Sequence, residues 1–465
     1  MAKRENDLGR DPIGPLLLRL AVPTVTAQLV NALYNIVDRM YIGHIAGVGD
    51  LALTGLGVCF PVIMFVSAIS ALVGMGGGSR AVVRMGEGRT EEANAILGSC
   101  SALLILLSVL VTVGFQLVKE PMLLLFGATE NTITYAVDYL TIYLWGTIFV
   151  EISLGLNFFI TSQGFSTISM ATVLIGAIIN IVLDPIFIFG FHMGVKGAAL
   201  ATITAQAVSA VWVLRFLTGK RTKLRLQRRY FRIKPRVLAP VLALGVSPFI
   251  MNATESLVNI AFNSSLKAYG GDAAVGAMTI CSSVMQVFFL LLQGIAQGAQ
   301  PIIGFNYGAG NLDRVKKTYR LLLISALSFS CTVWAALELF PGAFVALFND
   351  KPALVDLAVW TLRVYAGGMF ILGIQTACQQ TFVALGQAKI SLFLALLRKI
   401  ILLIPLIYIL PPFFSNKVLA VFLAEPAADI LAATTTGLMF LWQFPRILRR
   451  RGEELEHLRE KGATT

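Results

Sequence analysis

The chain has 465 residues, of which 57% are hydrophobic and 13% carry a charged side chain. Soluble domains average about 25% charged residues, so this composition, with a mean hydropathy of +0.78, excludes an ordinary soluble protein. The net charge of +12 does not indicate a nucleic-acid partner, because the basic residues gather in loops that carry no nucleic-acid-binding motif.

Apolar stretches of about 20 residues recur from end to end, and each is long enough to cross a bilayer as a helix. They predict twelve transmembrane helices, at roughly 15–41, 51–77, 93–118, 131–159, 168–190, 197–218, 238–266, 273–299, 317–340, 353–382, 391–412 and 418–444. Lys and Arg concentrate in alternate loops, with nine in the linker 219–236, whereas the opposite loops hold isolated lysines such as Lys351. This bias predicts a multi-pass protein of the inner (cytoplasmic) membrane with both termini in the cytoplasm.

The two halves of the chain repeat each other at a fixed offset of 222 residues. The matching pairs are Asp50 and Asp272, Gly76 and Gly298, Gly86 and Gly308, Gly88 and Gly310, Leu125-Phe126 and Leu347-Phe348, Tyr143 and Tyr365, and Gly164 and Gly386. An even number of helices per half gives both halves the same orientation in the membrane. We therefore expect an all-α membrane protein with two pseudo-symmetric six-helix bundles around a central cavity. Its expected parts are an N-lobe at 1–218, a basic cytoplasmic linker at 219–236, a C-lobe at 237–445 and a cytoplasmic tail at 446–465.

Paired glycines follow the second and the eighth predicted helix, as Gly86 with Gly88 and Gly308 with Gly310. Glycine adopts positive φ at little cost, so these pairs predict tight turns. A phosphate-binding loop would require a strand before it, in a nucleotide-binding frame that this sequence lacks. We expect neither an enzyme nor a bound cofactor.

Polar residues share single faces of three helices in the first half. The first helix carries Gln28, Asn31, Asn35 and Asp38 at spacings that place them on one face. The fifth carries Asn180 and Asp184, one turn apart and followed by Pro185, and the sixth carries Thr202 and Gln206. In the predicted topology Asp38, Asp184 and Thr202 reach similar depth in the outer half of the membrane.

Ionisable residues inside a membrane are costly and need a partner or a function. Oxygen ligands from Asp38, Asn180, Asp184 and Thr202 suit a hard cation such as Na⁺, and two nearby carboxylates also bind a shared proton. These four residues are our candidate cation site. The alternative is a structural polar network that packs three helices together.

The second half is polar but more nearly balanced in charge. Three acids (Glu255, Glu425 and Asp429) face three in-membrane bases (Arg363, Arg398 and Lys399), and an ion pair between Arg398 and Asp429 is expected. Structural ion pairs and a substrate or second ion site both remain open. Amides on the eighth and tenth helices suit varied organic cations in an apolar cavity. The candidate substrate or second ion site comprises Gln28, Asn31, Tyr34, Asn35, Gln206, Asn252, Glu255, Asn259, Gln286, Gln293, Gln297, Gln375, Gln379, Arg398, Glu425 and Asp429.

Glu151 stands apart, in the fourth helix toward its cytoplasmic end. It is either an inner relay acid or the partner of a base at that end such as Arg215. The candidate cation site itself is not repeated, because the 222-residue offset carries Asn180, Asp184 and Thr202 onto Leu402, Leu406 and Ala424.

Two segments carry a family resemblance: Asn180-Ile-Val-Leu-Asp184-Pro185, and Gly194-Val-Lys-Gly197-Ala-Ala199 before Thr202. Together with the acid on helix one and two six-helix halves, they resemble the multidrug and toxic compound extrusion (MATE) family, most closely its prokaryotic DinF/MepA-like branch. That family consists of secondary antiporters. The resemblance implies an N-lobe cation site at Asp38, Asn180, Asp184 and Thr202. It also puts a helix-ten acid site in doubt, since this chain has glutamines there.

The sequence therefore predicts a monomeric antiporter that works by alternating access of its lobes. It would export drugs or toxic organic compounds, often cationic, in exchange for H⁺ or Na⁺, and so contribute to antibiotic resistance. An alternative is a lipid-linked oligosaccharide flippase of a related fold, which would need a cavity dominated by basic residues for pyrophosphate. A membrane receptor or scaffold is a third reading, but it has no need for buried acids in two opposed bundles.

Overall fold

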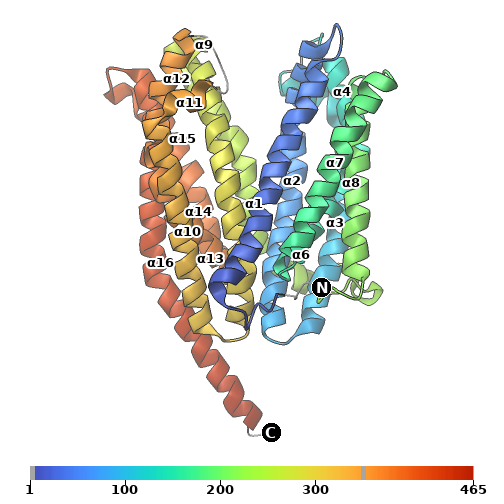
Figure 1. Cartoon of the computed structure of the whole chain (residues 1–465), viewed down its shortest axis with the longest axis vertical. Helices are drawn as coiled ribbons and strands as arrows, with labels where there is room; N and C mark the ends of the chain where they lie inside the picture. The colour runs from blue at the N-terminus through green and yellow to red at the C-terminus, as the bar shows by residue number, and fades with distance from the viewer. Residues whose placement is uncertain (1–5, 347–351, 464–465) are drawn as a thin grey trace. The chain divides into compact units, whose positions relative to one another are not determined.

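The computed structural model describes residues 6–346 and 352–463, and within these ranges every regular element is a helix. The all-α fold is confirmed (Figure 1). Leu347-Phe348 and Lys351 lie outside the described residues. The first half contains α1 (Ile13–Gly43), α2 (Gly49–Gly86), α3 (Thr90–Leu125), α4 (Ile133–Trp145), α5 (Thr147–Val150), η1 (Glu151–Gly155), α6 (Leu156–Ser162), α7 (Ser166–Pro185), η2 (Ile186–Gly190), α8 (Val195–Thr218) and η3 (Arg228–Tyr230). The second contains α9 (Pro235–Gly308), α10 (Leu312–Leu339), α11 (Pro341–Ala346), α12 (Pro352–Tyr365), η4 (Ala366–Ile371), α13 (Leu372–Ala384), α14 (Ala388–Leu396), η5 (Leu397–Leu403), α15 (Ile404–Ile409), η6 (Pro411–Phe413) and α16 (Lys417–Ala463).

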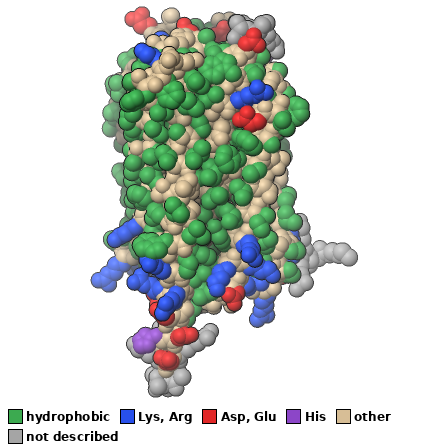
Figure 2. All heavy atoms as spheres, turned by 90° about the vertical axis from the view of Figure 1, so that its left-hand side faces the viewer, with side chains coloured by type: hydrophobic (Ala, Val, Ile, Leu, Met, Phe, Trp, Pro, Cys, Tyr) green, Lys and Arg blue, Asp and Glu red, His purple; other side chains and the backbone are tan. Residues whose placement is uncertain are grey.

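The described helices accommodate the twelve predicted crossings. Ten helical stretches are long and apolar enough to span a membrane, and a bent pair, Ile133–Trp145 with Thr147–Ser162, makes one more at an angle of 57°. The 74 residues of α9 are two helices in succession, because Gly271 has a non-helical backbone with φ of 64°. The face in Figure 2 has a broad band of hydrophobic side chains, with Lys and Arg gathered toward the end from which the C-terminal helix projects.

The chain packs as two compact units. Unit 1 consists of Met1–Asn6 and Thr26–Asn252, and unit 2 of Asp7–Val25 and Ala253–Thr465. The boundaries after Val25 and after Asn252 fall inside helices, in α1 and in α9, rather than in the basic linker. The first part of α1 therefore packs with the second half of the sequence, and the first part of α9 packs with the first half.

Glycines allow the first parts of α1 and α9 to pack closely against helices from the other half of the sequence. In unit 1, a Cβ on Gly76 of α2 would collide with the Val241 carbonyl of α9, and one on Gly245 with the Leu72 carbonyl of α2. In unit 2, Gly298 meets Ala21 of α1 in the same way. Membrane helices associate through such close backbone approach, because lipid is as apolar as the helices themselves. Gly76 and Gly298 are matched positions of the repeat, so the duplication conserved a packing contact.

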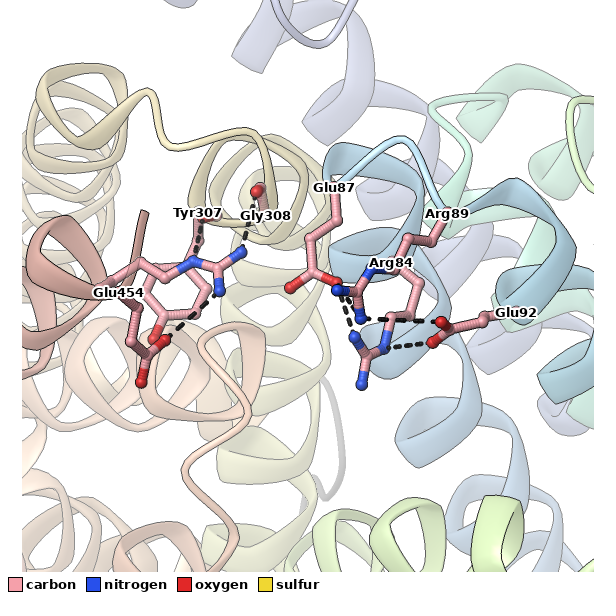
Figure 3. A network of polar contacts seen from close by, with 8 residues as sticks. Arg84, Glu87, Arg89, Glu92, Tyr307, Gly308 and Glu454 are labelled. Carbon is pink, nitrogen blue, oxygen red and sulfur yellow. Dashed lines mark hydrogen bonds and ion pairs between the residues drawn. The ribbon is translucent and has the colours of Figure 1, made fainter. Parts of the chain in front are cut away.

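The two glycine turns have the expected backbone, with φ of 77° at both Gly88 and Gly310. Their surroundings differ, as Figure 3 shows. In unit 1, Arg84 pairs with Glu87 at 2.7 Å and with Glu92 at 3.3 Å. In unit 2, Arg451 of α16 donates to the carbonyls of Tyr307 at 3.4 Å and Gly308 at 3.0 Å, which fixes the C-terminal helix to the end of α9.

The basic linker is attached to unit 1 by buried hydrogen bonds. The side-chain oxygen of Gln163, which is 1% exposed, accepts from the Thr222 hydroxyl at 2.9 Å and from the backbone N–H groups of Lys223 and Leu224 at 2.8 Å each. Leu224 is fully buried, whereas the basic side chains beside it are exposed. Alternation of inward and outward residues therefore sets the path of the linker.

Replacing Gln163 with Leu should lower the free energy of unfolding of unit 1 by about 1–3 kcal/mol, because buried donors would lose their acceptor. Thermal unfolding of the purified protein in detergent measures this. Gln227→Leu is the control, since that amide oxygen accepts only from exposed Arg229 among the bonds described for it. Equal unfolding temperatures for the two variants would contradict the anchoring role.

Candidate cation and substrate sites

The four residues of the candidate cation site lie together in unit 1, and we call them the acid site. Asn180 of α7 donates from its side-chain nitrogen to the Asp184 carboxylate at 3.2 Å and to the Thr202 hydroxyl of α8 at 3.4 Å. The Asp38 carboxyl of α1 interacts directly with that of Asp184. Asp184, Asn180 and Asp38 are 0%, 1% and 8% exposed. Residues far apart in the chain thus form one polar group, in which Asp38, Asn180 and Asp184 are buried and Thr202 is half-buried.

Local backbone features bring α7 and α8 together at this site. Asn180 and Asp184 are one helical turn apart and share a face. Pro185 has no N–H to continue the helix, and the chain proceeds as the π-helical segment η2. The close approach of α8 to η2 requires Gly197, because a Cβ there would lie 2.7 Å from the Phe187 carbonyl carbon. This contact sets the position of Thr202 further along α8.

Three oxygen atoms of the acid site remain without hydrogen-bond donors among the described residues: Asp38 Oδ1, Asn180 Oδ1 and Asp184 Oδ2. Arg39 is next in sequence to Asp38, but its guanidinium lies over the Phe60 ring, 5.4 Å from the centroid. Buried polar atoms normally have partners. A cluster of unpaired oxygens with two carboxyl groups suits a bound cation or a shared proton.

Tyrosines border the acid site, and one of them was not among the predicted residues. The Tyr139 hydroxyl of α4 hydrogen bonds to Thr202, and the Tyr139 ring stacks with Tyr143 at 6.1 Å between centroids. The i, i+4 spacing of these two tyrosines on an apolar helix was the available signal. Tyr34 of α1, which was predicted, interacts with Asn35 and Asp38.

The other predicted residues of unit 1 are more dispersed. Gln206 accepts from the Ser153 hydroxyl of η1 and so extends the polar surface of α8 away from Thr202. Asn35 is exposed and bonds back to the Asn31 carbonyl of its own helix at 2.7 Å. Gln28 and Asn31 are half-buried on α1, and Asn252 is exposed at the boundary of the unit.

In unit 2, Glu255, Arg398, Lys399, Glu425 and Asp429 form what we call the charge cluster. The expected ion pair between Arg398 and Asp429 is present, at 2.7 Å, and the same guanidinium pairs with Glu425 at 3.0 Å. Lys399 pairs with Glu255. Arg398 also lies over the Phe289 ring, 4.7 Å from the centroid.

Arg363 is not part of the cluster. It is exposed and donates to the Glu338 carbonyl at 3.2 Å. Three acids therefore face two bases, and Glu425 Oε2 and Asp429 Oδ2 have no hydrogen-bond donor among the described residues. The cluster is largely neutralised by its own bases, unlike the acid site, but it retains one carboxyl group in excess.

The predicted amides of unit 2 come together only in part. Gln375, Gln379 and Gln380 are buried on α13, and Gln380 donates to Gln293 of α9 at 3.1 Å. Gln380 was not among the predicted site residues, although it adjoins Gln379 in sequence. Asn259 bonds back to the Glu255 carbonyl at 3.1 Å. Gln286 is exposed and Gln297 half-buried on α9.

Replacing Arg398 with Leu should destabilise unit 2 by about 3–5 kcal/mol, because two buried carboxylates would lose their counter-charge. A loss of folded yield or of thermal stability in detergent measures this effect. Adding Glu425→Gln and Asp429→Asn to that variant should restore most of the stability. Arg363→Leu, at an exposed base, serves as the control. If Arg398→Leu behaves like that control, the ion pairs contribute little.

Comparison with known proteins agrees with this architecture. The MatE family profile matches residues 23–186 and 248–409, one match in each half of the repeat. The multidrug export protein MepA of Staphylococcus haemolyticus is 24% identical over 421 residues, which is 90% of this chain and 91% of the relative. A MATE crystal structure in the bent conformation superposes with a TM-score of 0.90 at 22% identity, over 96% of this chain and all of the other. An outward-facing multidrug resistance MATE transporter of the MOP superfamily gives 0.88, also at 22% identity and with the same coverage.

Because the sequence identity is low, the structural similarity shows the fold alone. The profile carries the family assignment, because its two matches cover most of the chain and coincide with the duplicated halves. The chain belongs to the MatE family of multi-span membrane transporters, which are not enzymes.

Proposed function

We propose that this protein is a secondary antiporter that exports small organic compounds, many of them cationic, in exchange for H⁺ or Na⁺ entering through the acid site. The observation that carries the proposal is the set of three unpaired buried oxygens on Asp38, Asn180 and Asp184. A buried polar group without a partner is destabilising. Binding a proton or a Na⁺ ion there would remove that cost. The cation would then favour the conformation of the protein in which these oxygens lie together.

Coupling follows if the geometry of the acid site changes between two conformations. A ligand shifts a conformational equilibrium only by its difference in affinity for the two states. Asp38 lies on α1, a helix whose first part belongs to the other unit. Movement of α1 relative to α7 would separate Asp38 from Asp184 and lower the affinity of the acid site for the cation. This is the physical basis on which we propose alternating access.

Export of varied organic compounds is proposed from the name of the MepA relatives and from the buried amides of unit 2. Gln375 and Gln379 offer polarity without fixed charge. Met278 and Met285 are buried on α9, and flexible methionine side chains tolerate different shapes. One chain contains both units, so we take the monomer as the working form.

We propose the inner (cytoplasmic) membrane as the location, with both termini in the cytoplasm. The gathering of Lys and Arg at one end of the face in Figure 2 supports this orientation. A flippase for lipid-linked oligosaccharides is less well supported. Arg398 and Lys399, two buried bases of unit 2, are both paired with acids and so are poorly placed to bind pyrophosphate.

Replacing Asp38 with Asn should reduce coupled export by about tenfold or more, which is within the usual range of coupling between sites. Proteoliposomes loaded with a fluorescent organic cation measure the rate of export. Asp50→Asn is the matched control, because Asp50 is exposed. Full-rate export against a gradient by the Asp38→Asn variant would show that the acid site does not couple transport.

The coupling ion can be identified in the same vesicles. A pH gradient and a Na⁺ gradient are imposed separately, and dye export should respond to one of them and be lost in Asp184→Asn. If neither gradient drives export by the unmodified protein, with other dyes giving the same result, antiport is wrong and the acid site is a structural polar network.

A further inference from the structure

Glu151 is a carboxylic acid that the acid site does not use. It is the first residue of η1 in unit 1, and its side chain has no exposed surface. Neither carboxylate oxygen accepts a hydrogen bond of normal geometry from the described residues. The polar group that interacts with it is the Ser70 hydroxyl of α2. Such a position is among the least favourable for an ionised carboxylate.

Close helix packing places Glu151 beside Ser70. A Cβ on Gly74 of α2 would collide with the Gly155 carbonyl of η1, so the two backbones touch at this point. Ser70 lies one turn before Gly74, and Glu151 four residues before Gly155. The two segments are two crossings apart in the predicted topology and run in the same direction, so Ser70 and Glu151 share a level. Isolated π-helical turns such as η1 are frequent at functional sites.

No base neutralises Glu151 among the described residues. The elements packed against η1 are α2, α3, α5, α6 and α8. Their charged side chains lie near the helix ends, and none is paired with Glu151 in the structure: Asp50, Arg80 and Arg84 on α2, Glu91, Glu92, Lys119 and Glu120 on α3, and Lys196 and Arg215 on α8. Arg215, the partner considered from sequence, is exposed. The titratable group that does face Glu151 is Tyr143 of α4.

Polar side chains extend from the acid site toward η1 inside unit 1. Thr202 accepts from Asn180, and Gln206 lies one turn further along α8 on the same face. Gln206 in turn accepts from Ser153, which lies two residues after Glu151 in η1. This row of polar side chains begins at the acid site and ends in η1, the segment that Glu151 begins.

We propose that Glu151 is a second, separate proton-binding site of unit 1, which exchanges its proton with the acid site along the row formed by Thr202, Gln206 and Ser153. When the acid site gives up a proton, an O–H bond on its carboxyl group breaks and one forms on Glu151. Before this step, Glu151 has given its own proton to water on the cytoplasmic side. This inference rests on the proposed antiport function for its transport step, but the occupancy of Glu151 by a proton does not.

Infrared titration of the purified full-length protein tests the site without transport. Protonated carboxyl groups give a C=O stretching band that carboxylates lack. At neutral pH the band should lose one component in Glu151→Gln and keep that component in the Asp38→Asn and Asp184→Asn variants. An unchanged band in Glu151→Gln means that Glu151 is ionised, and this result overturns the proposal. Glu120→Gln, an exposed acid-to-amide change, is the control.

Transport tests the exchange step. Glutamine keeps the shape of Glu151 but carries no exchangeable acid proton, so a merely structural role would leave export unchanged. Export driven by a pH gradient should fall about tenfold or more in Glu151→Gln, while binding of the organic cation stays within about twofold of the unmodified protein. Full-rate export with unchanged protons per exported dye overturns the exchange step. If the unmodified protein responds only to Na⁺, the exchange step is also wrong, and the infrared result separately decides whether Glu151 holds a proton.

Discussion

A bilayer offers no water to stabilise a buried charge. The two units of the molecule differ in how they meet this constraint. Unit 2 satisfies it for the most part internally, with Arg398 and Lys399 set against Glu255, Glu425 and Asp429, although one carboxyl group remains in excess. Unit 1 has buried acids at Asp38 and Asp184 with no ion-pair partner in the described structure. Its carboxyl groups therefore depend on a proton or on a bound cation for neutrality. The duplication that produced two similar bundles left this difference in chemistry between them.

The same lack of water affects how the helices pack. Without a hydrophobic driving force between helices, close approach of backbones at small residues becomes the main attraction. Gly76 and Gly298 provide it at matched positions of the repeat, each against the first part of the helix that begins the other half. The result is that α1 and α9 each divide their length between the two units. Asp38 lies on the part of α1 that belongs to unit 1, so a rearrangement of this helix would act directly on the acid site.

Irregular helical segments adjoin the polar sites. The segment η2 follows Asp184, η1 begins at Glu151, and η5 carries Arg398 and Lys399. A π-helical turn changes the direction in which the following side chains point and leaves backbone groups with altered bonding. Helical periodicity does not reveal such turns. The face predicted by simple spacing for Asn180 and Asp184 lies within the regular helix α7.

The sequence alone determined the spans, their number and the residues that share a helix face, because apolar run length and the helical repeat are local properties. The predicted topology also brought three polar faces to a common depth, and Asp38, Asn180, Asp184 and Thr202 lie together in the structure; their role as a cation site stays a prediction. Only the tertiary structure decided that Tyr139 contacts Thr202, that Arg363 stays outside the charge cluster, and that Glu151 has no basic partner. Each of these depends on contacts between helices distant in sequence. Such contacts are set by glycine-mediated packing of whole surfaces, which no local pattern specifies.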